Sequence, residues 1–153
     1  MKRIEVRLSL PVVAPLLDAV REVSEALKNK LAAPLEMGEV DEDLRDIWHD
    51  ELISAQNDDM AKLMAMFGSD FFAEGVIVLD EDNAEPVLRA CAALRLRLRE
   101  QFLKTLSDET LESGAVEIEQ LDESLRKAFT CYLFLATLEE LIIQYLDTSA
   151  GEE

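Results

Sequence analysis

The segment from Leu88 to Leu106 most constrains what this chain can fold into, because its pattern fits two different elements. Leucine alternates with arginine over residues 94–99, which is the two-residue period of a half-buried strand. The apolar positions of the whole segment also follow the period of a helix. A cap candidate at Asp82 or Asn83, a proline acceptable in the first turn and good helix formers afterwards favour a helix of about 20 residues. Because its leucines lie on opposite sides, we expect this helix to be central and covered on more than one face.

Three further segments carry the helical period. The first runs from about Val12 to Ala32, the second follows a cap at Asp41, and the most apolar one follows a cap at Asp122. The polar string at residues 56–59 is either a solvated turn or a break, and we favour one helix through it, with or without a kink. The expected apolar side of the second helix consists of Leu44, Ile47, Trp48, Leu52 and Ala55, and the same period resumes after the polar string at Met60, Leu63, Met64 and Phe67.

Two short segments have the pattern of β-strands. Apolar side chains alternate with polar or charged ones from Ile4 to Leu10, up to a proline. Residues 76–79 form a run rich in β-branched side chains, and Phe71 and Phe72 are expected in a connector before it. The two strands should pair, because an isolated strand leaves its backbone groups unsatisfied. We therefore predict an α-rich α+β fold, a bundle of about four helices with a small two-stranded β-sheet at the side.

The chain is strongly acidic, with 33 acidic and 15 basic residues and a formal net charge of −18. Such a field repels phosphate backbones and anionic lipid surfaces, so we expect no nucleic acid partner and no membrane contact. The longest near-apolar run, Ala128–Leu138, is far shorter than the ~20 residues of a membrane helix. The charged residues and prolines near the N-terminus are unlike a signal peptide, and we expect a cytoplasmic protein. We predict a single domain over residues 1–153, with a polar tail from about residue 148.

Cys91 and Cys131 lie in two of the predicted core helices. One interpretation is a pair of reduced, buried thiols that act as small hydrophobic side chains. The other is a redox-responsive regulator with a disulfide between neighbouring helices, which requires Cα atoms within about 7 Å of each other.

His49 is the only histidine, and it shares a helix face with Asp46 and Asp50. A di-iron or zinc site needs more ligands than these three residues supply, so we expect no metal and no cofactor. No serine or cysteine lies in a nucleophile motif, and the five glycines do not form a phosphate-binding loop. We therefore expect a non-enzymatic protein, and a small metal-dependent enzyme around His49 is the alternative.

Arg95, Arg97 and Arg99 are the candidate binding residues. A buried arginine must be paired, because an unpartnered charge in the core is very costly. A salt bridge that fixes the packing of two helices is the favoured interpretation. A contact with an anion or a peptide carboxylate through the planar guanidinium is the second, and simple exposure is the third. The candidate partners are Glu139 and Glu140, followed by Asp46, Asp50 and Glu51.

Several segments of the sequence, taken in their order along the chain, match the pattern of a known family. These segments are the opening strand before an apolar helix, Asp43-Leu44-Arg45, Val78-Leu79-Asp80-Glu81 leading into Leu94-Arg95-Leu96 and Leu98, and Tyr132-Leu133 to Leu138-Glu139-Glu140-Leu141. These pieces resemble an uncharacterised bacterial family of domains of unknown function, typical of Actinobacteria and often encoded beside the Clp protease adaptor.

The resemblance implies a helical fold and a regulatory or protein-interaction role, and it implies no active site. Arg95 is its most specific polar position, and the chain departs from the family pattern at Arg97 and Arg99, where the family is less charged. We expect a protein partner, or a homodimer formed through an apolar helix face.

Overall fold

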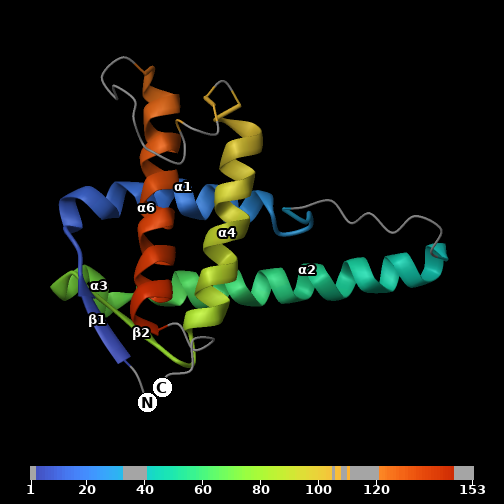
Figure 1. The fold of residues 1–153 in the computed structure, drawn as a ribbon, viewed down its shortest axis with the longest axis horizontal. Helices are drawn as coiled ribbons and strands as arrows, with labels where there is room; N and C mark the ends of the chain where they lie inside the picture. Colours follow the sequence, from blue (N-terminus) through green and yellow to red (C-terminus); the bar gives the residue numbers. More distant parts are fainter. Residues whose placement is uncertain (1–2, 33–40, 105, 108–109, 111–120, 147–153) are drawn as a thin grey trace.

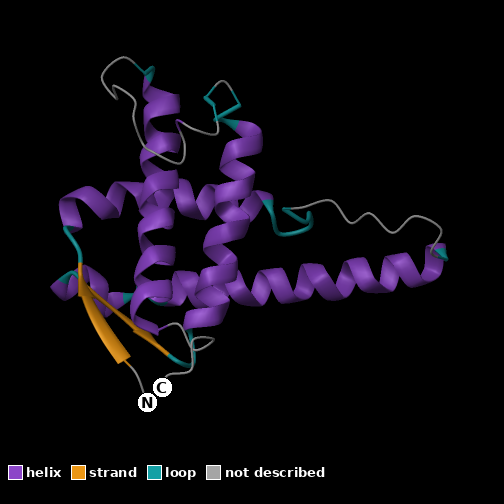
Figure 2. Ribbon diagram, viewed as in Figure 1, coloured by secondary structure: helices purple, strands orange, loops and turns teal. Residues whose placement is uncertain are grey.

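The computed structural model describes residues 3–32, 41–104, 106–107, 110 and 121–146. Within them lie four long helices, one short helix and a two-stranded sheet at the side of the helices (Figures 1 and 2). The predicted α-rich α+β fold is confirmed. In chain order the elements are β1 (Arg3–Arg7), α1 (Leu10–Ala26), α2 (Glu42–Ala65), α3 (Ser69–Glu74), β2 (Val76–Asp80), α4 (Ala84–Gln101) and α6 (Glu123–Leu146).

The segment with alternating leucine and arginine is a helix, as predicted, and it is central. It forms most of α4, which packs against α6, α2 and α1. In Figure 1, α4 and α6 run side by side in opposite directions, and α1 and α2 cross them at two different levels. The centre of the core contains Leu94 and Leu98 of α4 and Leu135 and Leu138 of α6, each at most 1% exposed.

The sheet closes one side of the helical core. Strands β1 and β2 pair antiparallel, with Ile4 opposite Leu79 and Val6 opposite Ile77. Ile77 and Leu79 are buried, so β2 presents its apolar face to the core. The sequence predicted both strands and their pairing, but β1 ends at Arg7 because α1 begins at Leu10.

A left-handed glycine joins α3 to the sheet. Gly75 has a φ of 72°, and its carbonyl accepts a hydrogen bond of 2.7 Å from the amide of Leu8. The predicted connector before β2 is wrong in one respect, because Phe71 and Phe72 belong to the short helix α3. Phe71 is fully buried there, and its ring meets Phe67 edge to face with centroids 5.2 Å apart.

The first helix is shorter than predicted at its C-terminal end. It stops at Ala26 instead of Ala32, and the chain turns at residues 27–30. Leu27 is still fully buried, so its helical spacing with earlier apolar residues reflects packing of the turn rather than continued helix. Side chains from α2 hold this turn.

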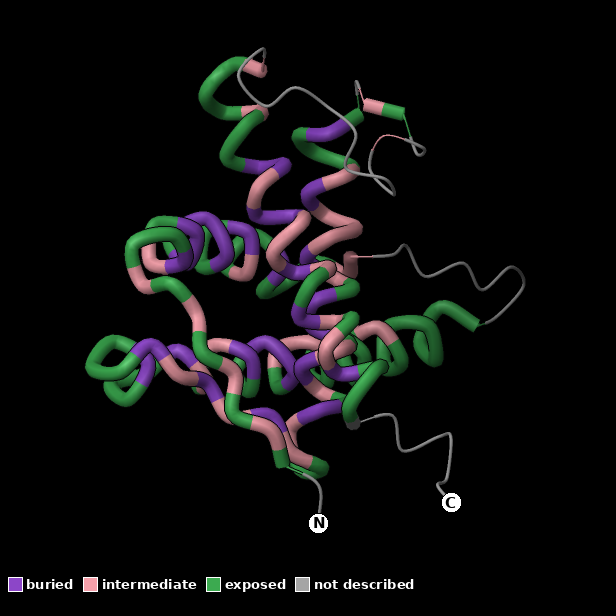
Figure 3. Tube along the Cα trace, turned by 60° about the vertical axis from the view of Figure 1, so that its left-hand side comes forward, coloured by how far each residue is buried: buried purple, intermediate pink, exposed green. Residues whose placement is uncertain are grey.

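The second helix is continuous through residues 56–59, as favoured, and it begins at the predicted Asp41 cap. The first part of its expected apolar side is wrong as a core face, whereas Met60 and Leu63 of the same period are buried. Leu44, Ile47, Trp48 and Leu52 are 39–55% exposed, and Ala55 is exposed as well. The residues of α2 that are buried lie near its other end, at Asp59, Met60 and Leu63. The physical reason is that the first half of α2 extends beyond α4, where no described element covers it (Figures 1 and 3).

Candidate functional site

Arg95 joins α4 to α6 as the sequence predicted. Its Nη1 donates a hydrogen bond of 2.7 Å to Oε1 of Glu139, the first-ranked partner. Its Nη2 donates to the hydroxyl of Tyr132 at 3.0 Å, and the guanidinium carbon lies 4.5 Å from the centre of that ring. Burial lowers the pKa of Arg95, but the hydrogen bond and charge of Glu139 outweigh it, so the pKa is raised overall. The guanidinium is therefore charged and committed to an internal partner.

The three candidate arginines do not all lie on one side of α4. Arg97 follows Arg95 by two residues, which places it on a different side of the helix. Its Nε is buried and has no hydrogen-bond partner within the described residues, and the same is true of Nε of Arg95. Arg99 is half-buried and lines a shallow pocket with Leu103 and Leu106.

A second arginine pair, which the sequence analysis missed, joins α4 to α2. Arg89 donates from Nε and Nη2 to the two carboxylate oxygens of Asp59, both at 3.0 Å. The hydrogen bond with Asp59 raises the pKa of Arg89. Asp59 belongs to the polar string through which one helix was favoured over a solvated turn, and its spacing of four residues from Leu63 places it on the buried side of α2. This spacing could have identified Asp59 as a buried residue from the sequence alone.

The polar string of α2 also holds the turn after α1. Nε2 of Gln56 donates to the carbonyls of Leu27 and Lys30, both at 2.9 Å, and its Oε1 accepts from the amide of Ala32 at 3.1 Å. Nδ2 of Asn57 donates to the carbonyl of Lys28 at 3.0 Å. Backbone groups that lose their partners where α1 ends are thus satisfied by side chains of another helix.

Cys91 and Cys131 are free and buried on the neighbouring helices α4 and α6. Burial raises the pKa of both thiols, that of Cys131 to about 12. A thiol is nucleophilic only as the thiolate, so neither cysteine is poised to react in the folded protein. These properties fit the interpretation of two small hydrophobic core residues.

His49 lies on the extending half of α2 with its side chain 43% exposed, and its Nδ1 is 3.9 Å from Oδ1 of Asp50. Within the part of the chain that the structure describes, no three His, Cys, Asp or Glu side chains gather as a metal site would require. The alternative of a metal centre at His49 has no support from its neighbours.

The exposed apolar side chains of α2 form a defined surface. We call Leu44, Ile47, Trp48 and Leu52 the α2 face. By helix geometry Ile47 has four neighbours, at positions 43, 44, 50 and 51, and three of them are carboxylates. Residues 41–52 contain six acidic side chains and one arginine, and all except His49 are exposed. The α2 face is thus apolar in its centre and acidic at its edge.

A groove continues the α2 face toward the body of the protein. Leu52 and Ala55 of α2 line it from one side, and Ala92, Ala93 and Leu96 of α4 line it from the other. Its volume is about 530 Å³. Its lining also includes Gln56 and the ion pair of Asp59 with Arg89, and the alanines at positions 55, 92 and 93 leave room for a large side chain of another molecule.

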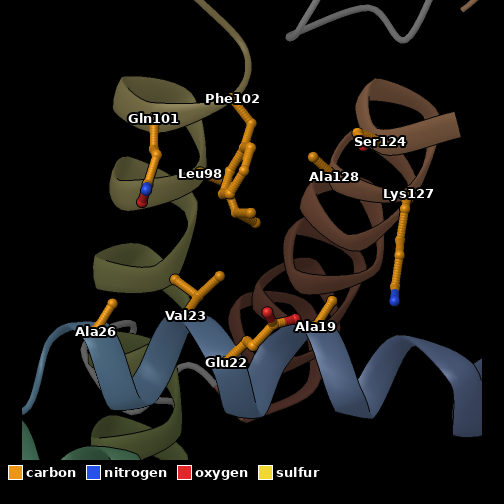
Figure 4. Close-up of a pocket in the computed structure, with 10 residues that line it drawn as sticks. All are labelled: Ala19, Glu22, Val23, Ala26, Leu98, Gln101, Phe102, Ser124, Lys127 and Ala128. Atoms are coloured by element: carbon orange, nitrogen blue, oxygen red, sulfur yellow. The ribbon is translucent and has the colours of Figure 1, made fainter. Parts of the chain in front are cut away.

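A second pocket lies between α1, α4 and α6 and has a volume of about 410 Å³. Leu98 of α4 and Phe102, directly after this helix, point into the space between the helices, and Val23 of α1 lies below them (Figure 4). Its polar residues include Glu22 and Lys127, which lie on different helices. Gln101 and Ser124 complete its polar lining.

Comparison of the sequence with known protein families identifies the family of this chain. The sequence profile described as "Domain of unknown function (DUF2017)" matches residues 11–146. The chain belongs to this family. The match extends from α1 to the end of α6, so the DUF2017 domain includes both arginine pairs, the α2 face and the groove. No curated protein and no solved structure gives a significant match to the chain.

Among the described residues of this DUF2017 domain, no helix has the length and apolar character needed to span a bilayer. Of the sites above, the α2 face with its groove is the one that offers uncovered apolar side chains, whereas the guanidinium groups of Arg89 and Arg95 are each paired with a carboxylate of the same chain.

Proposed function

We propose that the chain is a non-enzymatic protein-interaction or regulatory domain whose docking surface is the α2 face. One observation carries the proposal, namely that four large apolar side chains gather on one half of a helix that leaves the body of the protein. Single exposed apolar side chains are ordinary, whereas a contiguous patch marks an interaction site. Trp48 lies in this patch, and tryptophan is among the residues that contribute most to binding energy in protein interfaces.

Neither alternative has a comparable observation in its favour. A redox-responsive regulator needs reactive thiols, but burial raises the pKa of Cys91 and Cys131. A metal-dependent enzyme needs further ligands near His49, and the described residues do not supply them. The sequence also favoured a homodimer, which would use the same α2 face and is distinguished by the oligomeric state.

The experiment compares Ile47→Ser with Ile143→Ser. Both isoleucines are about half exposed, at 55% and 50%, but Ile143 lies on α6, away from the α2 face. Each purified variant is used as bait in extract of the source organism, after thermal unfolding shows that both fold. We expect Ile47→Ser to lose specific partners or self-association that wild type and Ile143→Ser retain. Equal recovery with all three baits would refute the proposal.

A cytoplasmic location, and the bacterial source and gene neighbourhood that the family resemblance implies, belong to the same proposal. Cell fractionation with an antibody against the chain tests the location. Recovery in the membrane or secreted fraction would contradict it.

A further inference from the structure

We infer that the occupant of the α2 face is a basic amphipathic helix of a partner protein. This inference rests on the proposed function, because it names the chemistry of the partner for the same surface. A helix that lays its apolar side into a groove is a recurrent mode of peptide recognition, and it suits a surface built from one projecting helix and the groove beside it.

The shape of the surface favours a helix. From Leu44 to Ala55 the apolar positions of α2 cover about 17 Å, at 1.5 Å for each residue. Leu52 belongs to both the α2 face and the groove, so the two form one continuous strip. Alanines at positions 55, 92 and 93 line the groove, and small side chains allow a second helix to approach and to insert a large apolar side chain. A partner helix of about three turns would cover this strip.

The negative charge of the α2 face predicts a positively charged partner helix. Asp43, Asp50 and Glu51 adjoin Ile47 on the surface of α2, and all three are exposed. Lysine or arginine beside the apolar stripe of the incoming helix would meet these carboxylates. Complementary charge at the edge of an interface raises the association rate and rejects partners of the wrong sign.

The same charge argues against a second copy. Two copies joined through the α2 face would bring together two segments that each carry six acidic residues and one arginine. Each chain also has a formal net charge of −18, so the long-range field opposes the encounter. An anionic membrane is disfavoured for the same reason.

The chain supplies its own probe, because Trp48 is its only tryptophan and lies in the α2 face, 41% exposed. The ligands are three synthetic 18-residue peptides without tryptophan. The first has leucine on one helical face and lysine on the other, the second replaces each lysine by glutamate, and the third scrambles the first to remove the apolar stripe. We expect the first to shift Trp48 emission to the blue and the other two to bind at least tenfold more weakly.

Two matched variants separate specific docking from general attraction to an acidic protein. Asp43→Asn/Asp50→Asn/Glu51→Gln removes three carboxylates beside Ile47. Glu74→Gln/Asp82→Asn/Glu140→Gln removes three exposed carboxylates elsewhere and changes the net charge equally. We expect the first variant to weaken binding of the basic peptide about tenfold and the second to change it less than twofold.

Peptide binding monitored by anisotropy of a labelled peptide gives a readout that does not depend on Trp48. In this measurement Ile47→Ser should abolish binding, whereas Ile143→Ser should retain it.

The results of these experiments either support the inference or overturn it. Equal weakening by the two triple variants, or equal binding of the basic and acidic peptides, would overturn it. Dimerisation of wild type that Ile47→Ser abolishes, without peptide binding, would assign the face to a second copy, which overturns the basic helix and leaves the proposed function in place. Absence of peptide binding together with bait recovery that is unaffected by Ile47→Ser would refute both.

Discussion

Arg95 of α4 and Glu139 of α6 form an ion pair of 2.7 Å in which both side chains are largely buried, 25% and 15% exposed. The pair joins the two helices that provide the centre of the core, and Tyr132 completes it by accepting a second hydrogen bond. Removal of one charge leaves the other without a partner in a poorly solvated place, whereas removal of both does not. The energetic role of the pair therefore lies in fixing how α4 packs on α6.

We expect Arg95→Met to lower the free energy of unfolding by roughly 1–3 kcal/mol, because it leaves Glu139 unpaired. Glu139→Gln, which keeps a neutral acceptor, should cost less. The double variant should lose less than the sum of the two single losses, as measured by urea unfolding in a double-mutant cycle. Arg3→Met, which breaks an ion pair whose side chains are 59% and 65% exposed, serves as the control and should have a much smaller effect. Additive losses would contradict the predicted coupling.

Gln56→Ala should destabilise the junction between α1 and α2. The substitution removes a side chain that donates to two backbone carbonyls and accepts from the amide of Ala32. We expect a loss of roughly 1–3 kcal/mol in urea unfolding, and faster amide hydrogen exchange at residues 27–32. Asp58→Ala, an exposed position of the same polar string, is the matched control and should change stability little. Equal effects of the two substitutions would show that the junction does not depend on Gln56.

Gly75→Ala should destabilise the sheet. At this position φ is 72°, and a Cβ atom would lie 2.9 Å from the carbonyl oxygen of Leu8. The left-handed conformation alone costs an L-residue roughly 1–2 kcal/mol, and the close contact adds to it. Gly68→Ala is the control, because its Cβ would make an ordinary contact of 3.6 Å with Ala65. Comparison of the two thermal unfolding midpoints tests the prediction, and a midpoint for Gly75→Ala at or above that of Gly68→Ala would be inconsistent with it.

The buried cysteines predict a loss of stability in alkaline solution. Their pKa values are raised above the ordinary 9.0, so above about pH 9 the unfolded chain releases thiol protons that the folded chain keeps. Each pH unit in this range should lower the free energy of unfolding by about 1.4 kcal/mol for each thiol, and the loss should end only where the folded thiols ionise. Below pH 9 the thiols should contribute no dependence on pH.

Urea midpoints of wild type and Cys91→Ala at pH 8 and pH 10 measure this effect. The variant starts from lower stability because it lacks a core side chain, but its decrease between the two pH values should be smaller by the contribution of one thiol. Equal decreases in the two proteins would contradict the assignment of the raised pKa to Cys91.

The sequence predicted the central elements because local pattern and local chemistry agree there. From Ala84 to Gln101 helix formers and an apolar period extending over several faces point to one buried helix, and the structure confirms it. The buried position of that helix then required a partner for Arg95, and Glu139 was the first candidate on the facing helix. The need to neutralise one buried charge thus predicted a contact between two residues that are 44 positions apart in the chain.

The sequence does not indicate contacts that depend on the position of a second element. The string from Gln56 to Asp59 lies within one helix, as favoured, but polar residues without visible partners are also typical of solvated loops, so its pattern predicts no partners for these side chains. In the folded chain its members bind the end of α1 and Arg89 of α4. Those partners lie about 30 residues away in the chain, and no local period indicates them.

The sequence by itself determined where the four long helices and the two strands lie, and that a charge inside the core must be neutralised, because backbone preferences and the cost of burying a charge act at each residue. The tertiary structure alone decided which apolar faces are covered. The period of α2 shows that Leu44, Ile47 and Trp48 share a side, but burial of that side depends on whether another element reaches it. Since the first half of α2 extends beyond α4, the described elements leave this side exposed, and the helix gains an outward face rather than a core face.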